Sequence, residues 1–207
     1  MVKEGYGYGL PLLVISGLLL AFRLYWAGGL FFAVAVFVLS FFRDPERRIP
    51  AEPRAIVSPA DGRVVQIVGE QIDGCEMQRM SIFMAPWNVH VNRAPASGIL
   101  RKVSYHPGTF HIASRPGASV ENEQNVFTIE SEEGSIHVRQ IAGALARRIV
   151  FWKRPGDWIK RGERVGLIKF GSRVDVIVRA GTEWRVKVGD HVRAGSTIIG
   201  ISKPEEG

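Results

Sequence analysis

The stretch Gly166-Leu167-Ile168-Lys169-Phe170-Gly171-Ser172-Arg173-Val174-Asp175-Val176 places a Gly-Ser pair between two apolar runs rich in β-branched residues. Such runs favour strands, so the pair is expected at a strand end. It lacks the Gly-x-Ser-x-Gly context of a hydrolase nucleophile. Glycine leaves its own carbonyl open to close approach and can adopt strained dihedrals. The Ser172 hydroxyl can therefore attack the carbonyl of Gly171 and move the acyl group from nitrogen to oxygen.

Short β-branched runs, separated by Gly, Pro and Asp, continue on both sides of this stretch. They predict a mainly β domain over residues 56–207. Only residues 141–150 invite a helical interpretation. The runs expected to form strands are residues 64–68, 80–84, 126–129, 136–141 and 174–178.

The β region also contains an internal echo, that is, a short sequence that recurs further along the chain. The turn Gly156-Asp157-Trp158-Ile159-Lys160-Arg161-Gly162 recurs 33 residues later as Gly189-Asp190-His191-Val192-Arg193-Ala194-Gly195. In such a turn the glycines supply positive φ and the aspartate caps the backbone. The repeated turn resembles those of lipoyl-type barrel-sandwich domains. We therefore expect a barrel-sandwich-like β domain and assign the two turns a structural role.

The N-terminal segment, residues 1–42, is strongly apolar. From Leu10 to Phe42 the only charge in 33 residues is Arg23. One helix of that length would measure about 50 Å, against a hydrocarbon core of roughly 30 Å. We therefore expect two segments, 10–22 and 30–42, forming a membrane-associated hairpin that need not cross fully.

A basic, proline-rich linker, residues 43–55, follows the hairpin. Arg43, Arg47 and Arg48, which lie beside the apolar end, indicate the cytoplasmic side of the cell membrane for the catalytic part. The net charge of +7 suits an anionic membrane surface, whereas the scattered Lys and Arg carry no nucleic-acid motif. The single cysteine, Cys75, excludes an internal disulfide and fits a reducing compartment.

Three motifs occur in order: Ser58-Pro59-Ala60-Asp61-Gly62-Arg63-Val64, the segment Phe83–Pro95, and Leu167–Val176. Together they closely resemble the phosphatidylserine decarboxylases, in their short (archaeal-type) form, from about residue 41 to the C-terminus. The resemblance implies self-cleavage between Gly171 and Ser172.

According to this resemblance, the products of cleavage are a large β chain, residues 1–171, and a small α chain, residues 172–207, which stay together as a heterodimer. Ser172 becomes a covalent pyruvoyl group, so no external cofactor and no metal are expected. Through a Schiff base, that group would accept the electron pair left when phosphatidylserine loses CO2 and becomes phosphatidylethanolamine. The implied partners are a phospholipid substrate and a membrane, with a higher oligomer possible.

Two residues in the earlier motifs are candidates for proton chemistry. From spacing alone, Asp61 belongs to an Asp-Gly β-turn; the resemblance implies that it joins a triad-like group supporting self-cleavage. His90 alternates with valines and should share a strand face with Asn88 and Asn92, toward a cleft or water. With the resemblance, His90 is the expected proton-transfer residue.

The second motif departs from the better-known long-form pattern, which has two histidines three residues apart. Here His90 is followed by Arg93 at the second position. The base that acts on Ser172 is therefore open: His90 serves both steps, or His111 helps. Arg93 cannot be a general base and is expected, with His111, to bind substrate phosphate or carboxylate.

Two other functions compete with the decarboxylase. A membrane-anchored barrel-sandwich adaptor or carrier fits the echo and the hairpin, and would leave the chain uncut. No modifiable lysine at a hairpin tip stands out for a carrier. A zinc peptidase would need a His-x-His pair, and none occurs among the five histidines.

Overall fold

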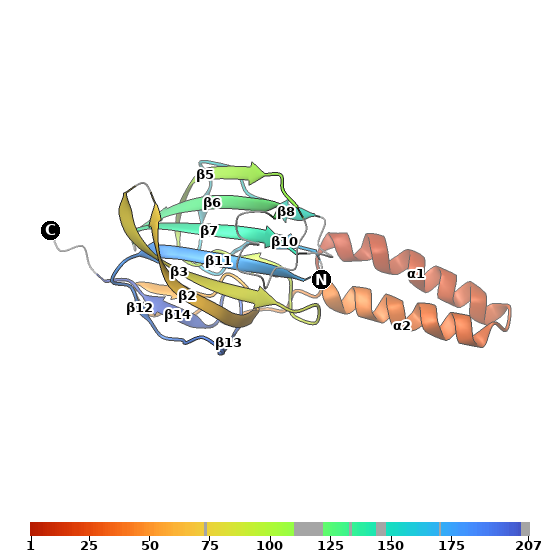
Figure 1. The fold of residues 1–207 in the computed structure, drawn as a ribbon. Helices are drawn as coiled ribbons and strands as arrows, with labels where there is room; N and C mark the ends of the chain where they lie inside the picture. The colour runs from red at the N-terminus through yellow and green to blue at the C-terminus, as the bar shows by residue number, and fades with distance from the viewer. Residues whose placement is uncertain (73, 110–121, 133, 144–147, 170, 204–207) are drawn as a thin grey trace. The chain divides into compact units, whose positions relative to one another are not determined.

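The computed structural model describes residues 1–72, 74–109, 122–132, 134–143, 148–169 and 171–203 (Figure 1). The chain divides into two compact units, which are considered one at a time. The first contains residues 1–46 together with 87–89, and the second contains residues 47–86 and 90–207.

The first unit is a helical hairpin of α1 (Lys3–Ala21) and α2 (Tyr25–Phe41). The helices pack closely because a glycine of one faces a leucine of the other: Gly9 contacts Leu39, and Gly28 contacts Leu20. The hydroxyl of Ser16 donates to the carbonyl of Gly28 at 2.8 Å, which satisfies a buried polar group inside the hairpin.

The expected two segments are present, but their bounds differ from the prediction. The break spans only residues 22–24, where Arg23 takes a left-handed φ of 60°, so the Gly28-Gly29 pair lies inside α2. Of the described helices, α1 alone is long and apolar enough to cross a membrane. At 1.5 Å per residue it measures about 28 Å, close to the thickness of a hydrocarbon core.

The second unit contains strands and no helix among its described residues, which confirms the mainly β prediction. An eight-stranded sheet has the order β13-β2-β3-β11-β7-β6-β5-β9, and two smaller sheets have the orders β1-β14-β12 and β4-β10-β8 (Figure 1). All the pairings are antiparallel. The strands are β1 (Ala55–Val57), β2 (Gly62–Ile72), β3 (Cys75–Met84), β4 (Val91–Arg93), β5 (Gly98–His106), β6 (Gln124–Ser131), β7 (Gly134–Ala142), β8 (Ile149–Phe151), β9 (Trp158–Ile159), β10 (Arg164–Ile168), β11 (Ser172–Arg179), β12 (Glu183–Trp184), β13 (His191–Val192) and β14 (Ile198–Ile201).

All five predicted strand runs lie within strands of this unit, in β2, β3, β6, β7 and β11. The helical interpretation of residues 141–150 is wrong at both described ends of that segment. Ile141 and Ala142 belong to β7, and residues 149–150 belong to β8. Ladder pairing of Ile141 with Arg173 on β11 overrides the weak local helical preference.

The repeated Gly-Asp turns have the conformation expected of them. All four of their glycines have positive φ, between 73° and 103°. Each turn aspartate accepts the backbone N–H of the residue three positions earlier, Asp157 at 2.8 Å and Asp190 at 2.9 Å. The two turns therefore share the same capping hydrogen bond and lie at equivalent places in the fold.

The repeat extends far beyond these turns. Taken in chain order, strands β4 to β10 correspond one by one to β1, β2, β3, β11, β12, β13 and β14. In the large sheet, the two members of each corresponding pair lie equally far from the two edges. Reciprocal hydrogen bonds join the halves: Val57 N–H donates to Pro95, and Arg93 N–H donates to Pro59, both at 2.9 Å. The domain consists of two equivalent halves, one inserted into the other between β3 and β11.

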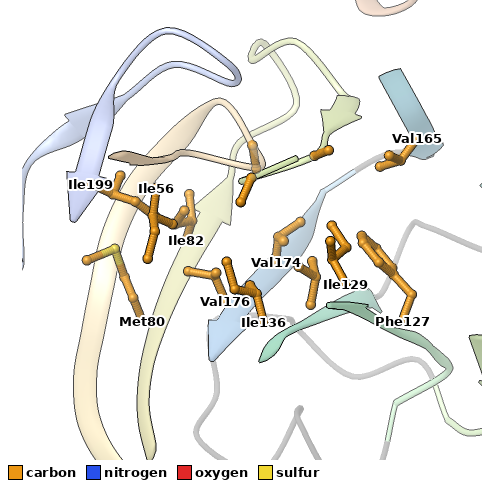
Figure 2. Close-up of a cluster of buried hydrophobic side chains, with 14 of the residues drawn as sticks. Ile56, Met80, Ile82, Phe127, Ile129, Ile136, Val165, Val174, Val176 and Ile199 are labelled. Atoms are coloured by element: carbon orange, nitrogen blue, oxygen red, sulfur yellow. The ribbon is translucent and has the colours of Figure 1, made fainter. Parts of the chain in front are cut away.

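The hydrophobic core lies where side chains from all three sheets meet, as Figure 2 shows. Val174 and Val176 project into it from β11, opposite Ile56 of β1, Val165 of β10 and Ile199 of β14. Each of these five side chains is fully buried, and each contributes roughly 1.5–3 kcal/mol of transfer free energy. The core thus positions β11, which begins at Ser172.

Candidate functional site

The Gly-Ser pair lies at the end of the central strand β11. Gly171 has a left-handed φ of +62°, and Ser172 is the first residue of the strand, paired with Met84 on one side and Ala142 on the other. Ser172 is 0% exposed, and its hydroxyl donates to the sulfur of Met84 at 3.4 Å. A thioether is a weak acceptor, so the hydroxyl is held in the interior without a strong bond.

His90 lies on the segment that enters β4. Its carbonyl accepts the N–H of Ile168 at 3.3 Å, and β4 pairs with β10, the strand that leads to the junction. His90 is 1% exposed and Asn92 is 0% exposed, so of the two expected surroundings, a cleft or water, these side chains do not meet water, and the cleft stays a prediction. The flanking valines are buried too, because both faces of this segment are covered.

Asp61 is held by contacts with residues that are distant in the sequence. Its carboxylate accepts two hydrogen bonds from Arg47, at 2.9 and 3.0 Å, and one from the backbone N–H of Ala194 at 2.7 Å. Within the described part of the chain, neither His90 nor Ser172 is among its partners. The triad-like role of Asp61 stays a prediction.

Arg93 is also bound within the fold. Its guanidinium donates to the carbonyl of Gly162 at 2.9 Å, and its side chain is largely buried. Its role in substrate binding stays a prediction. His111, the other residue expected there, lies outside the described residues. Among the residues that are described, no group of three or more His, Cys, Asp and Glu side chains is placed to hold a metal ion.

Three buried amides beside the junction were not predicted from the sequence. Gln140 donates to the side-chain oxygen of Asn92 at 2.8 Å, and Asn125 donates to that of Gln140 at 2.9 Å. The amide nitrogen of Asn92 then lies 3.7 Å from the Met84 sulfur, the atom that Ser172 also contacts. The only sequence signal was Asn92 within its motif, because the other two amides come from distant strands.

A buried ionic cluster lies on the opposite face of β11. Arg173, 2% exposed, donates to both carboxylate oxygens of Asp175, at 2.6 and 3.1 Å, and to Ser81 at 2.7 Å. Arg79 adds contacts to Ser81 and Asp175 at 3.0 and 3.4 Å. The alternation of polar and apolar residues along β11 was visible in the sequence, but the burial of its polar face was not.

The mainly β domain thus holds an interior serine at the start of its central strand, directly after a left-handed glycine and close to buried amide side chains. The family model for phosphatidylserine decarboxylase matches residues 34–200. The chain therefore belongs to the phosphatidylserine decarboxylase family and is an enzyme of phosphatidylserine decarboxylation, a step of phospholipid synthesis. This confirms the predicted family and enzyme class, and the adaptor is not favoured.

Curated relatives carry the same family name. The phosphatidylserine decarboxylase proenzyme of Solibacter usitatus is 48% identical over 206 residues, covering 96% of this chain and 95% of its own. The proenzyme of Burkholderia ambifaria is 42% identical, covering 92% of each chain, and that of Salinibacter ruber is 46% identical, covering 83% and 78%. The word proenzyme describes these relatives as precursors that are processed.

Proposed function

We propose that this chain cuts itself between Gly171 and Ser172 and uses the resulting pyruvoyl group to convert phosphatidylserine into phosphatidylethanolamine and CO2. The observation that carries this proposal is the interior Ser172 hydroxyl, which follows a left-handed glycine and, among the described residues, donates its hydrogen bond to a thioether. A serine in that position can rotate toward the carbonyl carbon of the residue before it.

The proposed cleavage has two stages, an acyl shift from nitrogen to oxygen and an elimination. The Ser172 oxygen adds to the Gly171 carbonyl carbon, and the C–N bond between the two residues breaks, which leaves an ester and a free amine. A base then removes the α-hydrogen of Ser172, and its Cβ–Oγ bond breaks. Gly171 leaves as a carboxylate that keeps the former serine oxygen. The remaining enamine tautomerises and takes up water, releasing ammonia and leaving the pyruvoyl group.

Roles for the other candidate residues are proposed chiefly from the family to which the chain belongs. His90 is the proposed proton carrier because it is buried on the segment bonded to β10. Which base acts on Ser172, His90 or His111, is part of the test. Asp61 is proposed to support self-cleavage, and Arg93 and His111 to bind the substrate.

The pyruvoyl ketone, once formed, supplies an electron sink for the bond that loses CO2. The chain around it supplies an apolar wall, since Met84, Ile168 and Val174 are all buried. Such surroundings penalise the charged carboxylate of the bound substrate relative to neutral CO2.

The two proposed chains remain associated because the cut falls at a strand end. The small chain, residues 172–207, would contain β11, which pairs with β3 at eight positions and with β7 at six. Its later strands β13 and β14 pair with β2 and β1 of the large chain. Separating the chains would break the middle of the large sheet.

The helical unit supports the proposal of a membrane location. Large apolar side chains such as Val14, Leu18 and Phe32 are exposed on its helices. Tyr8 and Trp87 are also exposed, as expected for aromatic residues at a membrane interface. We propose that the hairpin anchors the enzyme in the cell membrane with the catalytic domain on the cytoplasmic side, where a phospholipid headgroup is within reach. A higher oligomer stays a prediction.

The test is a denaturing gel with intact-mass analysis of the purified protein, followed by an assay of CO2 release from phosphatidylserine vesicles. We expect two fragments divided between Gly171 and Ser172, with no free amine at the start of the small one. Ser172→Ala should give one uncut, inactive chain. An uncut wild-type chain with an intact serine would overturn the mechanism and return the adaptor function to consideration.

A further inference from the structure

The three amides beside the junction form a continuous buried series of hydrogen bonds that ends at the Met84 sulfur, the atom to which Ser172 also donates. Asn92 and Gln140 are 0% exposed and Asn125 is 4% exposed. Asn125 and Gln140 are directly paired across β6 and β7, and Gln140 is paired with Val174 of β11. Asn92 reaches the same interior layer from β4, a strand of a smaller sheet.

The direction in which these three amides donate follows from the last contact in the series. The Met84 sulfur can accept a hydrogen bond but cannot donate one, so Asn92 must direct its NH2 group toward it. Asn92 then accepts from Gln140, and Gln140 accepts from Asn125. All three amides therefore direct their donors toward the Ser172 side of the site.

The last donor in the chain has a poor partner. The NH2 group of Asn92 is 3.7 Å from a thioether, and the Ser172 hydroxyl is 3.4 Å from the same sulfur. Within the described residues, these are the side-chain hydrogen bonds that the two groups donate. A buried amide donor with only a sulfur partner is available to an oxygen atom that acquires negative charge nearby.

The fold does not require amides at these positions. In the equivalent half of the domain, Ile56 pairs with Gly200 as Asn92 pairs with Gly166, and Val178 occupies the place of Gln140. Both Ile56 and Val178 are fully buried. The equivalent half thus closes with apolar side chains at the places of Asn92 and Gln140, whereas Gln78, which pairs with Val178 as Asn125 pairs with Gln140, is an amide at the place of Asn125.

We propose that Asn92 is an oxygen-binding donor for self-cleavage, and that Gln140 and Asn125 are positioning residues that aim its NH2 group. This inference rests on the proposed function and assigns a further residue to it. When the Cβ–Oγ bond of Ser172 breaks, the electron pair passes to the former serine oxygen, now part of the Gly171 carboxylate. Asn92 is placed to donate to this oxygen as its charge develops.

The test is a pulse–chase experiment on the full chain, translated in vitro with phospholipid vesicles and followed on denaturing gels. The main variant is N92I/Q140V, which installs the residues that the equivalent half already carries. We expect it to fold with a melting temperature near that of the wild type and to cut about 100- to 1,000-fold more slowly, as when one oxyanion donor is lost. The matched control, Ile56→Val, changes the equivalent position and should cut at the wild-type rate.

Two single changes separate positioning from packing. In Q140E the carboxylate still accepts from Asn125 but now draws the NH2 group of Asn92 toward itself, so cutting should be slower than in Q140L. In N92D the side chain can donate only when it is protonated, so cutting should recover as the pH falls. A purely structural role would give neither the ordering nor the pH dependence.

The outcomes distinguish this inference from the proposed function. If the wild type cuts between Gly171 and Ser172 but N92I/Q140V cuts at the same rate, the role of Asn92 is refuted and the decarboxylase mechanism stands. If the wild type never cuts, the mechanism itself fails. If N92I/Q140V loses its near-ultraviolet circular dichroism, and therefore its fixed packing, the test passes to the single variants. Equal cutting rates for Q140E and Q140L, together with a cutting rate of N92D that does not change with pH, would then refute the proposal.

Discussion

The ionic cluster behind β11 allows a quantitative prediction for Asp175→Ala. Asp175 is 0% exposed, and its two oxygens receive bonds from Arg173 and Arg79. Removing the carboxylate leaves the guanidinium of Arg173, 2% exposed, as a buried charge without its counter-ion. Breaking such a pair costs about 3–5 kcal/mol. Since whole domains are stable by only about 5–15 kcal/mol, the change should remove a large share of the folding free energy.

The assay is urea unfolding in a Ser172→Ala background, which keeps the chain in one piece so that unfolding is unimolecular. The decisive comparison is the double variant R173L/D175L, in which neither charge remains. Replacing a buried ion pair by apolar side chains is often neutral or stabilising, so the double variant should be more stable than Asp175→Ala. A loss below about 1 kcal/mol for the single variant, or an equal loss for the double variant, would refute this account.

Three further predictions concern other parts of the chain. Gly171→Ala, also in the Ser172→Ala background, should lower the free energy of unfolding by about 1–2 kcal/mol, the cost of a left-handed φ of +62° for a residue with a Cβ atom. The added carbon meets no atom within 4 Å, so no clash contributes, and an unchanged melting temperature would contradict this prediction. Deleting residues 1–42 should abolish flotation with phospholipid vesicles while self-cleavage continues, and persistent flotation would show that the hairpin is not the anchor. Glu163→Gln should cost about 0.2–1 kcal/mol at neutral pH and nothing in acid, as chemical denaturation at several pH values can check. Burial raises the pKa of Glu163, but hydrogen bonds from Lys153 and from the backbone of Lys160 lower it overall, so its contribution is present above the unfolded pKa and disappears as the pH falls through the folded one.

The sequence predicted the local features of the fold well. Alternating β-branched runs identified strands such as 174–178, since strand formation depends on side chains that repeat every two residues. The echo at residues 156–162 and 189–195 correctly predicted turns with positive φ. In contrast, the boundaries of the helical hairpin depended on packing between its helices: the turn is made at a left-handed Arg23, and residues 25–29, which lay between the predicted segments, belong to α2.

The equivalence of the two halves could be only partly read from the chain. The 33-residue echo gave one sign of it, but the match of β4 to β1 and of β7 to β11 has little sequence identity. It becomes visible through reciprocal pairings, such as Val57 with Pro95 and Arg93 with Pro59. Backbone hydrogen bonds repeat where side chains have diverged, because a ladder constrains the main chain and not the residue type.

For the site, the sequence by itself identified the family through three motifs in order, and it singled out Gly171 and Ser172 as the proposed reactive pair because the two residues are adjacent in the chain. Only the tertiary structure showed that Ser172 is interior, that Asp61 binds Arg47, and that Asn92 bonds to Gln140, which in turn bonds to Asn125. The physical reason is sequence separation: Asn92 and Gln140 are 48 residues apart along the chain, and only the stacking of a small sheet on the large one brings their side chains to 2.8 Å.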